Sequence, residues 1–205
     1  MKGKTPLRGE NQTLLRILFL AAFFLCGVFF GQAAALRVPP AVGRELRNYL
    51  SDFLLLEEGS LRSEAVLSAL LIYFRYPLLA CLLGFMSLGL VLLPCAAAVF
   101  GFFFSFSVCC FTAVFGGEGV LLALAVFGLR CAVTLPCFFL LAVPAWSASA
   151  SLAAFSVGKG KRVTVYDRRW LVRLGIVVLV LFAGVCVELF VSPYLLRLAL
   201  ERALF

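Results

Sequence analysis

The sequence predicts an all-α integral membrane protein, built as a bundle of about five transmembrane helices. Hydrophobic residues make up 64% of its 205 residues and charged residues only 14%, whereas a soluble domain is about half apolar and a quarter charged. The apolar residues gather in runs of about the 20 residues that cross a bilayer. From Pro77 to Phe115 the chain has 39 residues without a charge. We therefore expect residues 1–205 to form a single polytopic domain whose solvent is lipid.

The polar residues that are present exclude several classes of enzyme. The sequence has no His, which rules out Ser-His-Asp and Cys-His hydrolases and the H-E-x-x-H zinc site. Asp52 and Asp167 both lie outside the apolar runs, so an intramembrane pair of aspartates is absent. The eight Cys all lie in apolar stretches without a C-x-x-C pair, which favours a packing role. The composition predicts a protein that is not an enzyme and that uses no cofactor or metal.

The first predicted span covers about residues 16–36. Gly27 and Gly31 have the small-xxx-small spacing that lets two membrane helices approach closely. Basic residues precede the run and three alanines end it, a pattern also found in cleavable signal peptides. The apolar run has the full length of a span and exceeds the usual core of a signal peptide. We therefore predict a helix that is retained.

Residues 37–76 form the predicted outer segment, which carries five Arg and five acidic residues. Its apolar residues recur at helical spacing, which predicts an amphipathic helix, followed after Gly59 by a second helix that ends at Pro77. The candidate partner-binding face on the first helix consists of Leu46, Tyr49, Leu50 and Phe53. The alternative is that these helices lie on the bilayer or on their own bundle.

The uncharged run is too long for one helix, because 39 residues would extend about twice the thickness of the hydrocarbon core. We predict a break at Pro94, which gives spans at about 77–93 and 94–115. The next span, 119–146, contains Pro136, and a break at that proline is the alternative way to reach the same number of spans. The last span, 171–191, is followed by Pro193, a further predicted helix break.

Charge predicts the topology. Segment 158–173 has six basic residues and one acidic residue. The first sixteen residues have four basic residues and one acidic residue. Basic flanks face the cytoplasm, so the N-terminus and the loop 158–170 are expected inside and the outer segment outside. Five spans then place the C-terminus on the extracytoplasmic side.

Two charged residues lie within predicted spans. Arg130 is eleven residues into its span, where a charge costs at least a few kcal/mol, about 2.5–3.5 by insertion scales. Glu188 is close to the outer end of the last span. We predict that the two form one polar centre, with a vertical offset of about 12 Å that the arginine bridges by extending outward. The alternatives are that Glu188 meets water at the interface and that Arg130 binds carbonyls near Pro136.

The order of these features resembles the stage II sporulation protein M family. The resemblance rests on the ending from Gly184 to Pro193, in which Glu188 precedes the proline, and on the outer residues Tyr49–Phe53. It rests also on the glycines and proline that punctuate the middle of the chain, Gly84, Gly89, Pro94, Gly101 and Gly116. The likeness covers nearly the whole chain. One departure is that Leu129 and Arg130 stand where the family tends to have Pro followed by Gln or His.

The resemblance implies a non-catalytic protein of the bacterial cell membrane that acts in engulfment during spore formation. In that family the protein anchors and localises two peptidoglycan-degrading partners, the stage II sporulation proteins D and P. The alternative function is a small transporter or permease subunit, because broken helices and an intramembrane arginine are features of a substrate path. A neighbouring gene for an ATPase would favour the permease, and neighbouring sporulation genes would favour the scaffold.

Overall fold

The computed structural model describes residues 6–37, 63–156 and 168–204, and every regular element in these ranges is a helix. In chain order the elements are α1 (Pro6–Ala35), α3 (Ser63–Gly84), α4 (Gly89–Phe115), α5 (Glu118–Ala123), the π-helix η1 (Leu124–Gly128), α6 (Leu129–Ser156) and α7 (Arg168–Leu204). The predicted partner face Leu46, Tyr49, Leu50 and Phe53 and most of the loop 158–170 lie outside the described residues.

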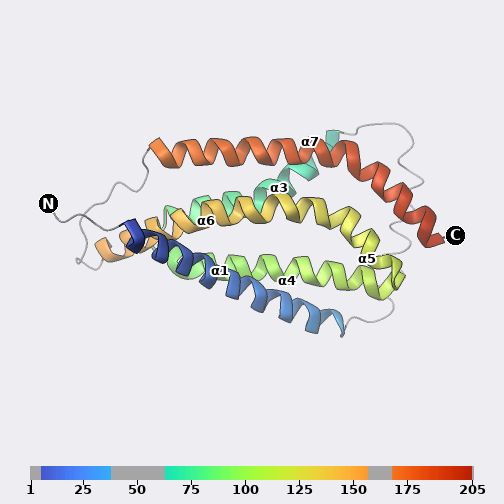
Figure 1. Ribbon diagram of the computed structural model, residues 1–205, viewed down its shortest axis with the longest axis horizontal. Helices are drawn as coiled ribbons and strands as arrows, with labels where there is room; N and C mark the ends of the chain where they lie inside the picture. Colours follow the sequence, from blue (N-terminus) through green and yellow to red (C-terminus); the bar gives the residue numbers. More distant parts are fainter. Residues whose placement is uncertain (1–5, 38–62, 157–167, 205) are drawn as a thin grey trace.

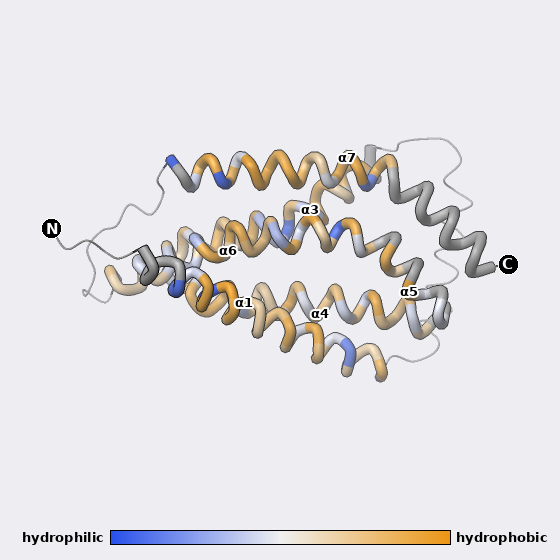
Figure 2. The backbone as a smooth tube through the Cα atoms, viewed as in Figure 1, coloured by the Kyte–Doolittle hydropathy of each residue, from blue (hydrophilic) through white to orange (hydrophobic). Residues whose placement is uncertain are grey.

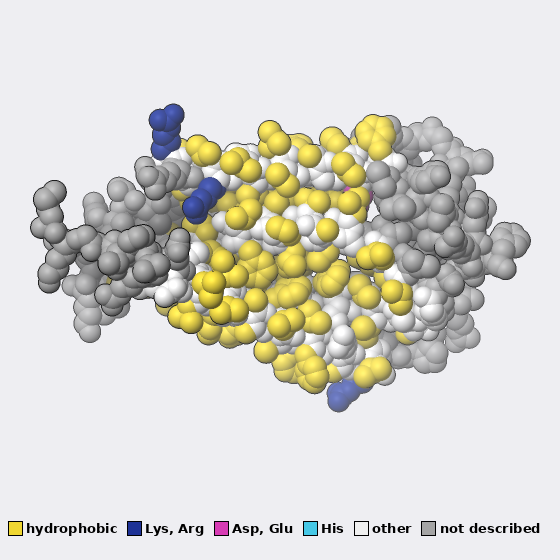
Figure 3. All heavy atoms as spheres, viewed as in Figure 1, with side chains coloured by type: hydrophobic (Ala, Val, Ile, Leu, Met, Phe, Trp, Pro, Cys, Tyr) yellow, Lys and Arg dark blue, Asp and Glu magenta, His cyan; other side chains and the backbone are white. Residues whose placement is uncertain are grey.

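The helices lie side by side as an elongated bundle in which successive passes run in alternating directions (Figure 1). The passes are α1, α3, α4, the combined α5–η1–α6 rod and α7. Four helices are long and apolar enough to cross a membrane, and α3 adds a shorter apolar stretch, Ala69–Gly84. Hydrophobic residues follow the middle of every pass (Figure 2), and they cover the outer surface there (Figure 3). The structure confirms an all-α membrane bundle.

The chain reverses between α3 and α4 at residues 85–88, so the predicted break at Pro94 is wrong. Pro94 lies in the second turn of α4, where its missing N–H removes one hydrogen bond close to the helix start. The reversal uses glycine instead, because a Cβ on Gly89 would lie 2.0 Å from the Leu83 carbonyl oxygen. Pro77 also lies inside a helix, α3, so residues 63–76 belong to the bundle and not to a separate outer helix.

A serine on a distant helix covers the backbone of this turn. The Ser149 hydroxyl of α6 is fully buried and donates to the Met86 carbonyl at 2.7 Å, with the Ser87 carbonyl at 3.1 Å. Carbonyls freed by a turn inside a membrane need such a partner, because lipid offers none. Ser149 therefore closes the α3–α4 turn against α6.

The predicted break at Pro136 is also wrong, because α6 continues through both Pro136 and Pro144. The irregular part of this pass is the π-helix Leu124–Gly128, which joins α5 to α6. Prolines are tolerated within membrane helices when neighbouring groups satisfy the freed backbone. The α7 backbone likewise stays helical past Pro193 to Leu204, although its C-terminal part changes direction (Figure 1).

Helices α1 and α4 pack closely against each other along three glycines. A Cβ on Gly27 would lie 1.9 Å from the Ala98 carbonyl oxygen, and one on Gly31 would lie 2.5 Å from that of Phe102. On the α4 side, a Cβ on Gly101 would lie 2.2 Å from the carbonyl of Phe24. The backbones touch directly at these glycines, as the small-xxx-small spacing predicts.

Candidate functional site

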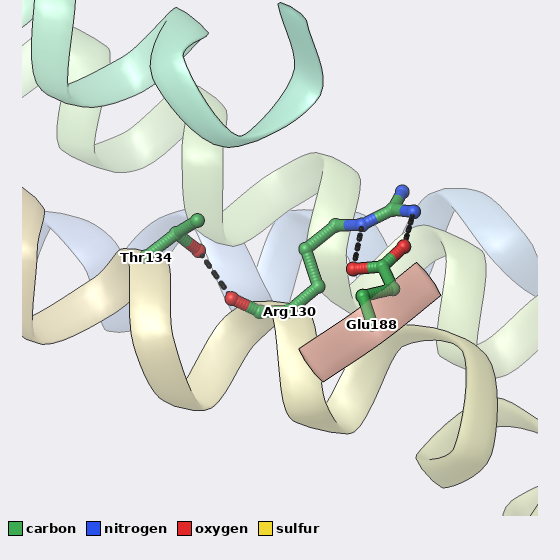
Figure 4. Close-up of polar contacts among 3 residues, drawn as sticks. All are labelled: Arg130, Thr134 and Glu188. Carbon is green, nitrogen blue, oxygen red and sulfur yellow. Dashed lines mark hydrogen bonds and ion pairs between the residues drawn. The ribbon is translucent and has the colours of Figure 1, made fainter. Parts of the chain in front are cut away.

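Arg130 and Glu188 lie at the contact between α6 and α7 (Figure 4). Arg130 is the second residue of α6, directly after the π-helix, and Glu188 is on α7. Gly184 precedes Glu188 by one helical turn on the same face. A Cβ there would lie 2.9 Å from both Tyr73 Cε1 and Val133 Cγ1. Gly184 therefore lets α7 approach α3 and α6 closely enough for the two charges to meet.

The two side chains form a two-point ion pair. Arg130 Nε donates to Glu188 Oε2 at 3.3 Å, and Arg130 Nη2 donates to Glu188 Oε1. The Arg130 side chain is 23% exposed and the Glu188 side chain 10%. Charge-assisted bonds with this fork geometry are stronger than neutral ones and fix the relative orientation of both groups. The pair thus neutralises two charges at the point where it joins α6 to α7.

Two further polar groups surround the pair. The Thr134 hydroxyl donates to the Arg130 carbonyl at 2.8 Å, one turn along α6. The Tyr73 ring of α3 lies 6.0 Å from Arg130 Cζ. Its hydroxyl is buried next to Glu188 but does not complete a hydrogen bond of ordinary geometry with it. Three passes, α3, α6 and α7, therefore converge on one polar centre.

The structure brings together the two residues that the sequence proposed as a pair, but without the predicted 12 Å offset. The offset assumed that Arg130 lies eleven residues into a span that begins at residue 119. Instead Arg130 is the second residue of the apolar span Leu129–Ser156, and Glu188 is the third residue from the end of the span Trp170–Phe190. The two charges therefore lie at corresponding ends of neighbouring spans.

The chemistry of this centre is that of a fixed charge pair. It combines the guanidinium of Arg130, the carboxylate of Glu188 and the buried hydroxyl of Tyr73. Among the described residues, no three His, Cys, Asp or Glu side chains group so that they could hold a metal ion. The arrangement can lock helices together or respond to a charged species that reaches it.

Arg75 is a second charged residue within the bundle, and its position was missed from the sequence. It was expected in the outer segment, whereas the structure places it on α3, exposed on the side of the bundle. Its Nη2 donates to the Tyr76 hydroxyl at 2.6 Å, and its Cζ lies 4.6 Å from the Tyr76 ring and 6.0 Å from that of Phe103. Residues 66–84 contain no other charge, a signal that this stretch is one span with a central arginine.

Comparison of the chain with protein-family models, with curated proteins and with solved structures finds no match. The fold and the apolar helices define the class: a multi-pass α-helical membrane protein.

Proposed function

We propose that this chain is a non-catalytic membrane scaffold that anchors and localises partner proteins at the cell membrane. The observation that carries the proposal is that polar side chains inside the bundle hold its helices to one another. Arg130 and Glu188 join α6 to α7, and Ser149 joins α6 to the α3–α4 turn. Arg16 of α1 donates to the Ser147 hydroxyl of α6. Polar side chains that bond one helix to another favour a rigid scaffold over a path through which a substrate is transported.

The resemblance to the stage II sporulation protein M family supplies the partners in this proposal. They are the peptidoglycan-degrading stage II sporulation proteins D and P, which act on the septal wall during engulfment. Partner contacts on the extracytoplasmic side would come from the segment before α3, where Leu46, Tyr49, Leu50 and Phe53 form the expected face. The orientation that this requires, with the N-terminus in the cytoplasm and the C-terminus outside, follows from the charge bias.

A co-purification experiment tests the proposal. The tagged full-length chain, expressed with the two wall-degrading proteins, should retain both of them on an affinity resin. Phe53→Asp should abolish this retention without lowering the amount of chain in the membrane, because a charge on an apolar docking face costs binding. Ser156→Asp introduces the same charge on the exposed end of α6, next to the loop expected in the cytoplasm, and should retain both partners. Failure of the unmodified chain to retain either protein would contradict the proposal.

A second candidate, a small transporter or permease subunit, is favoured by one feature. The π-helix Leu124–Gly128 ends two residues before Arg130, close to the Arg130–Glu188 pair. Single-turn π segments often occur at functional sites in helices. Stable association of the chain with an ATPase, in place of wall-degrading enzymes, would favour this candidate.

A further inference from the structure

We infer that the exposed face formed by α3 and α4 around Arg75 docks a membrane-spanning helix of another protein, one that carries a carboxylate near the middle of the bilayer. The contact lies within the membrane, so the inference goes beyond the proposed recruitment of wall-degrading enzymes outside it and does not depend on their identity.

Arg75 interrupts an otherwise apolar exposed stripe on α3. Leu71, Leu78 and Leu82 are 63%, 55% and 54% exposed, and with Arg75 they recur at the spacing of one helical face. On the adjoining pass, Val99 and Phe103 of α4 are also exposed. The contact of Arg75 with Phe103 shows that the two stripes adjoin. They form one lateral surface with a single charge at its centre.

The charge lies level with the middle of the apolar stretch of α4. Phe103, whose ring lies 6.0 Å from the Arg75 guanidinium, falls within the apolar stretch Gly89–Ala113 of α4. It is fourteen residues from one end of that stretch and ten from the other, about 21 Å and 15 Å along the helix. One side chain does not cover either distance by extending toward water. An arginine exposed to lipid at this depth is costly and calls for a partner.

The described part of this chain does not supply a carboxylate for Arg75. The Tyr76 hydroxyl and the two aromatic rings solvate the guanidinium without neutralising its charge. Among the side chains that the structure describes, Glu188 is the one carboxylate, and it pairs with Arg130. The four apolar spans contain no Asp or Glu besides Glu188. The spans of a second copy therefore offer no unpaired carboxylate to Arg75. Charge complementarity points to a different protein, with Asp or Glu in the middle of its transmembrane helix.

A defined helix tests this inference. The purified full-length chain is reconstituted in lipid vesicles with a synthetic helix of about 21 Leu and Ala residues that carries one central Glu, or Gln in the matched peptide. Association is measured by resonance energy transfer between labels on the chain and the peptide. We expect the Glu helix to bind about five- to thirtyfold more tightly than the Gln helix, the range found for polar contacts between model membrane helices.

Variants of the chain identify the site. Arg75→Leu should reduce binding of the Glu helix to that of the Gln helix, whereas Arg75→Lys should retain most of the preference. Arg173→Leu removes an exposed arginine near the start of α7 and should change nothing. A photo-crosslinking residue at Leu78 should capture the Glu helix, and one at Leu179, 70% exposed on α7, should not.

Three results would overturn the inference: equal binding of the Glu and Gln helices, unchanged binding by Arg75→Leu, or equal capture at Leu78 and Leu179. Crosslinking of one copy of the chain to another through Leu78 would assign the face to self-association and would overturn it as well.

Discussion

At the scale of single residues, the two buried charges exist as a unit. A buried ion pair gives little net stability, because the cost of removing both charges from water offsets most of their attraction. Each charge alone, however, would be left uncompensated in lipid. The Arg130–Glu188 pair therefore acts mainly on the alignment of α6 and α7: it penalises any packing in which the two helices shift relative to each other.

This coupling predicts a non-additive result. Glu188→Leu alone should lower the free energy of unfolding by about 3–5 kcal/mol, because it strands the Arg130 charge. The double variant Glu188→Leu and Arg130→Leu should lose much less, since an apolar pair of side chains needs no compensation. Steric trapping in bicelles measures both values. Losses that simply add would show that each residue is stabilised separately and that the pair has no such role.

The sequence indicated the pairing but not its geometry. Two opposite charges in neighbouring apolar runs limit the possible partners, so the pairing could be proposed from residue types alone. The relative depth of the two charges could not, because the sequence predicts one span over 119–146, whereas the apolar span of α6 begins only at Leu129, after the π-helix Leu124–Gly128. The sequence also misplaces Arg75, because Pro77 predicts a helix boundary, whereas α3 continues through this proline. Packing in a membrane bundle overrides the local preference of proline to end a helix.

At the scale of helices, glycine marks the contacts more reliably than proline marks the breaks. Pro94 and Pro136 both lie inside helices. The turns instead lie beside glycines: Gly89 adjoins the α3–α4 reversal, and Gly116, with φ of 63°, ends α4. Positive φ is easily reached only without a Cβ, so glycine suits the residue that ends α4. Between helices, a glycine lets two backbones touch, as Gly27 does for α1 and α4.

Two glycine substitutions of the same kind should therefore have opposite effects. Gly27→Ala should lower the free energy of unfolding by about 1–3 kcal/mol, because its Cβ would overlap the Ala98 carbonyl oxygen at 1.9 Å and force α1 away from α4. Gly175→Ala on α7 has no atom within 4 Å of its Cβ and should be neutral or stabilising by up to about 1 kcal/mol. Thermal unfolding in a mild detergent compares them. Equal effects would contradict the close α1–α4 contact.

At the scale of the whole molecule, the order of passes follows from apolar length and charge. The structure has the alternating passes expected from the sequence, although their boundaries differ, and the starts of α1 and α7 lie at the same end of the bundle (Figure 1). The contact of Arg16 with Ser147 places the start of α1 beside the last part of α6. The start of α1, the last part of α6 and the start of α7 therefore lie at the same end of the bundle, opposite the end of α7.

A reporter experiment determines which side of the membrane this end faces. A reporter active only in the cytoplasm should work when it is fused after Lys161 and stay inactive after Arg202, because six basic residues against one acid in segment 158–173 hold that segment inside. Replacing Lys159, Lys161 and Arg162 with Gln should weaken this orientation and produce a mixed population, since the positive charge of short loops sets topology.

Activity at both fusion sites in the unmodified chain would mean that α7 does not cross the membrane. The opposite pattern would keep the five passes and invert them, which would place the segment before α3 in the cytoplasm and remove it from any partner acting on the cell wall.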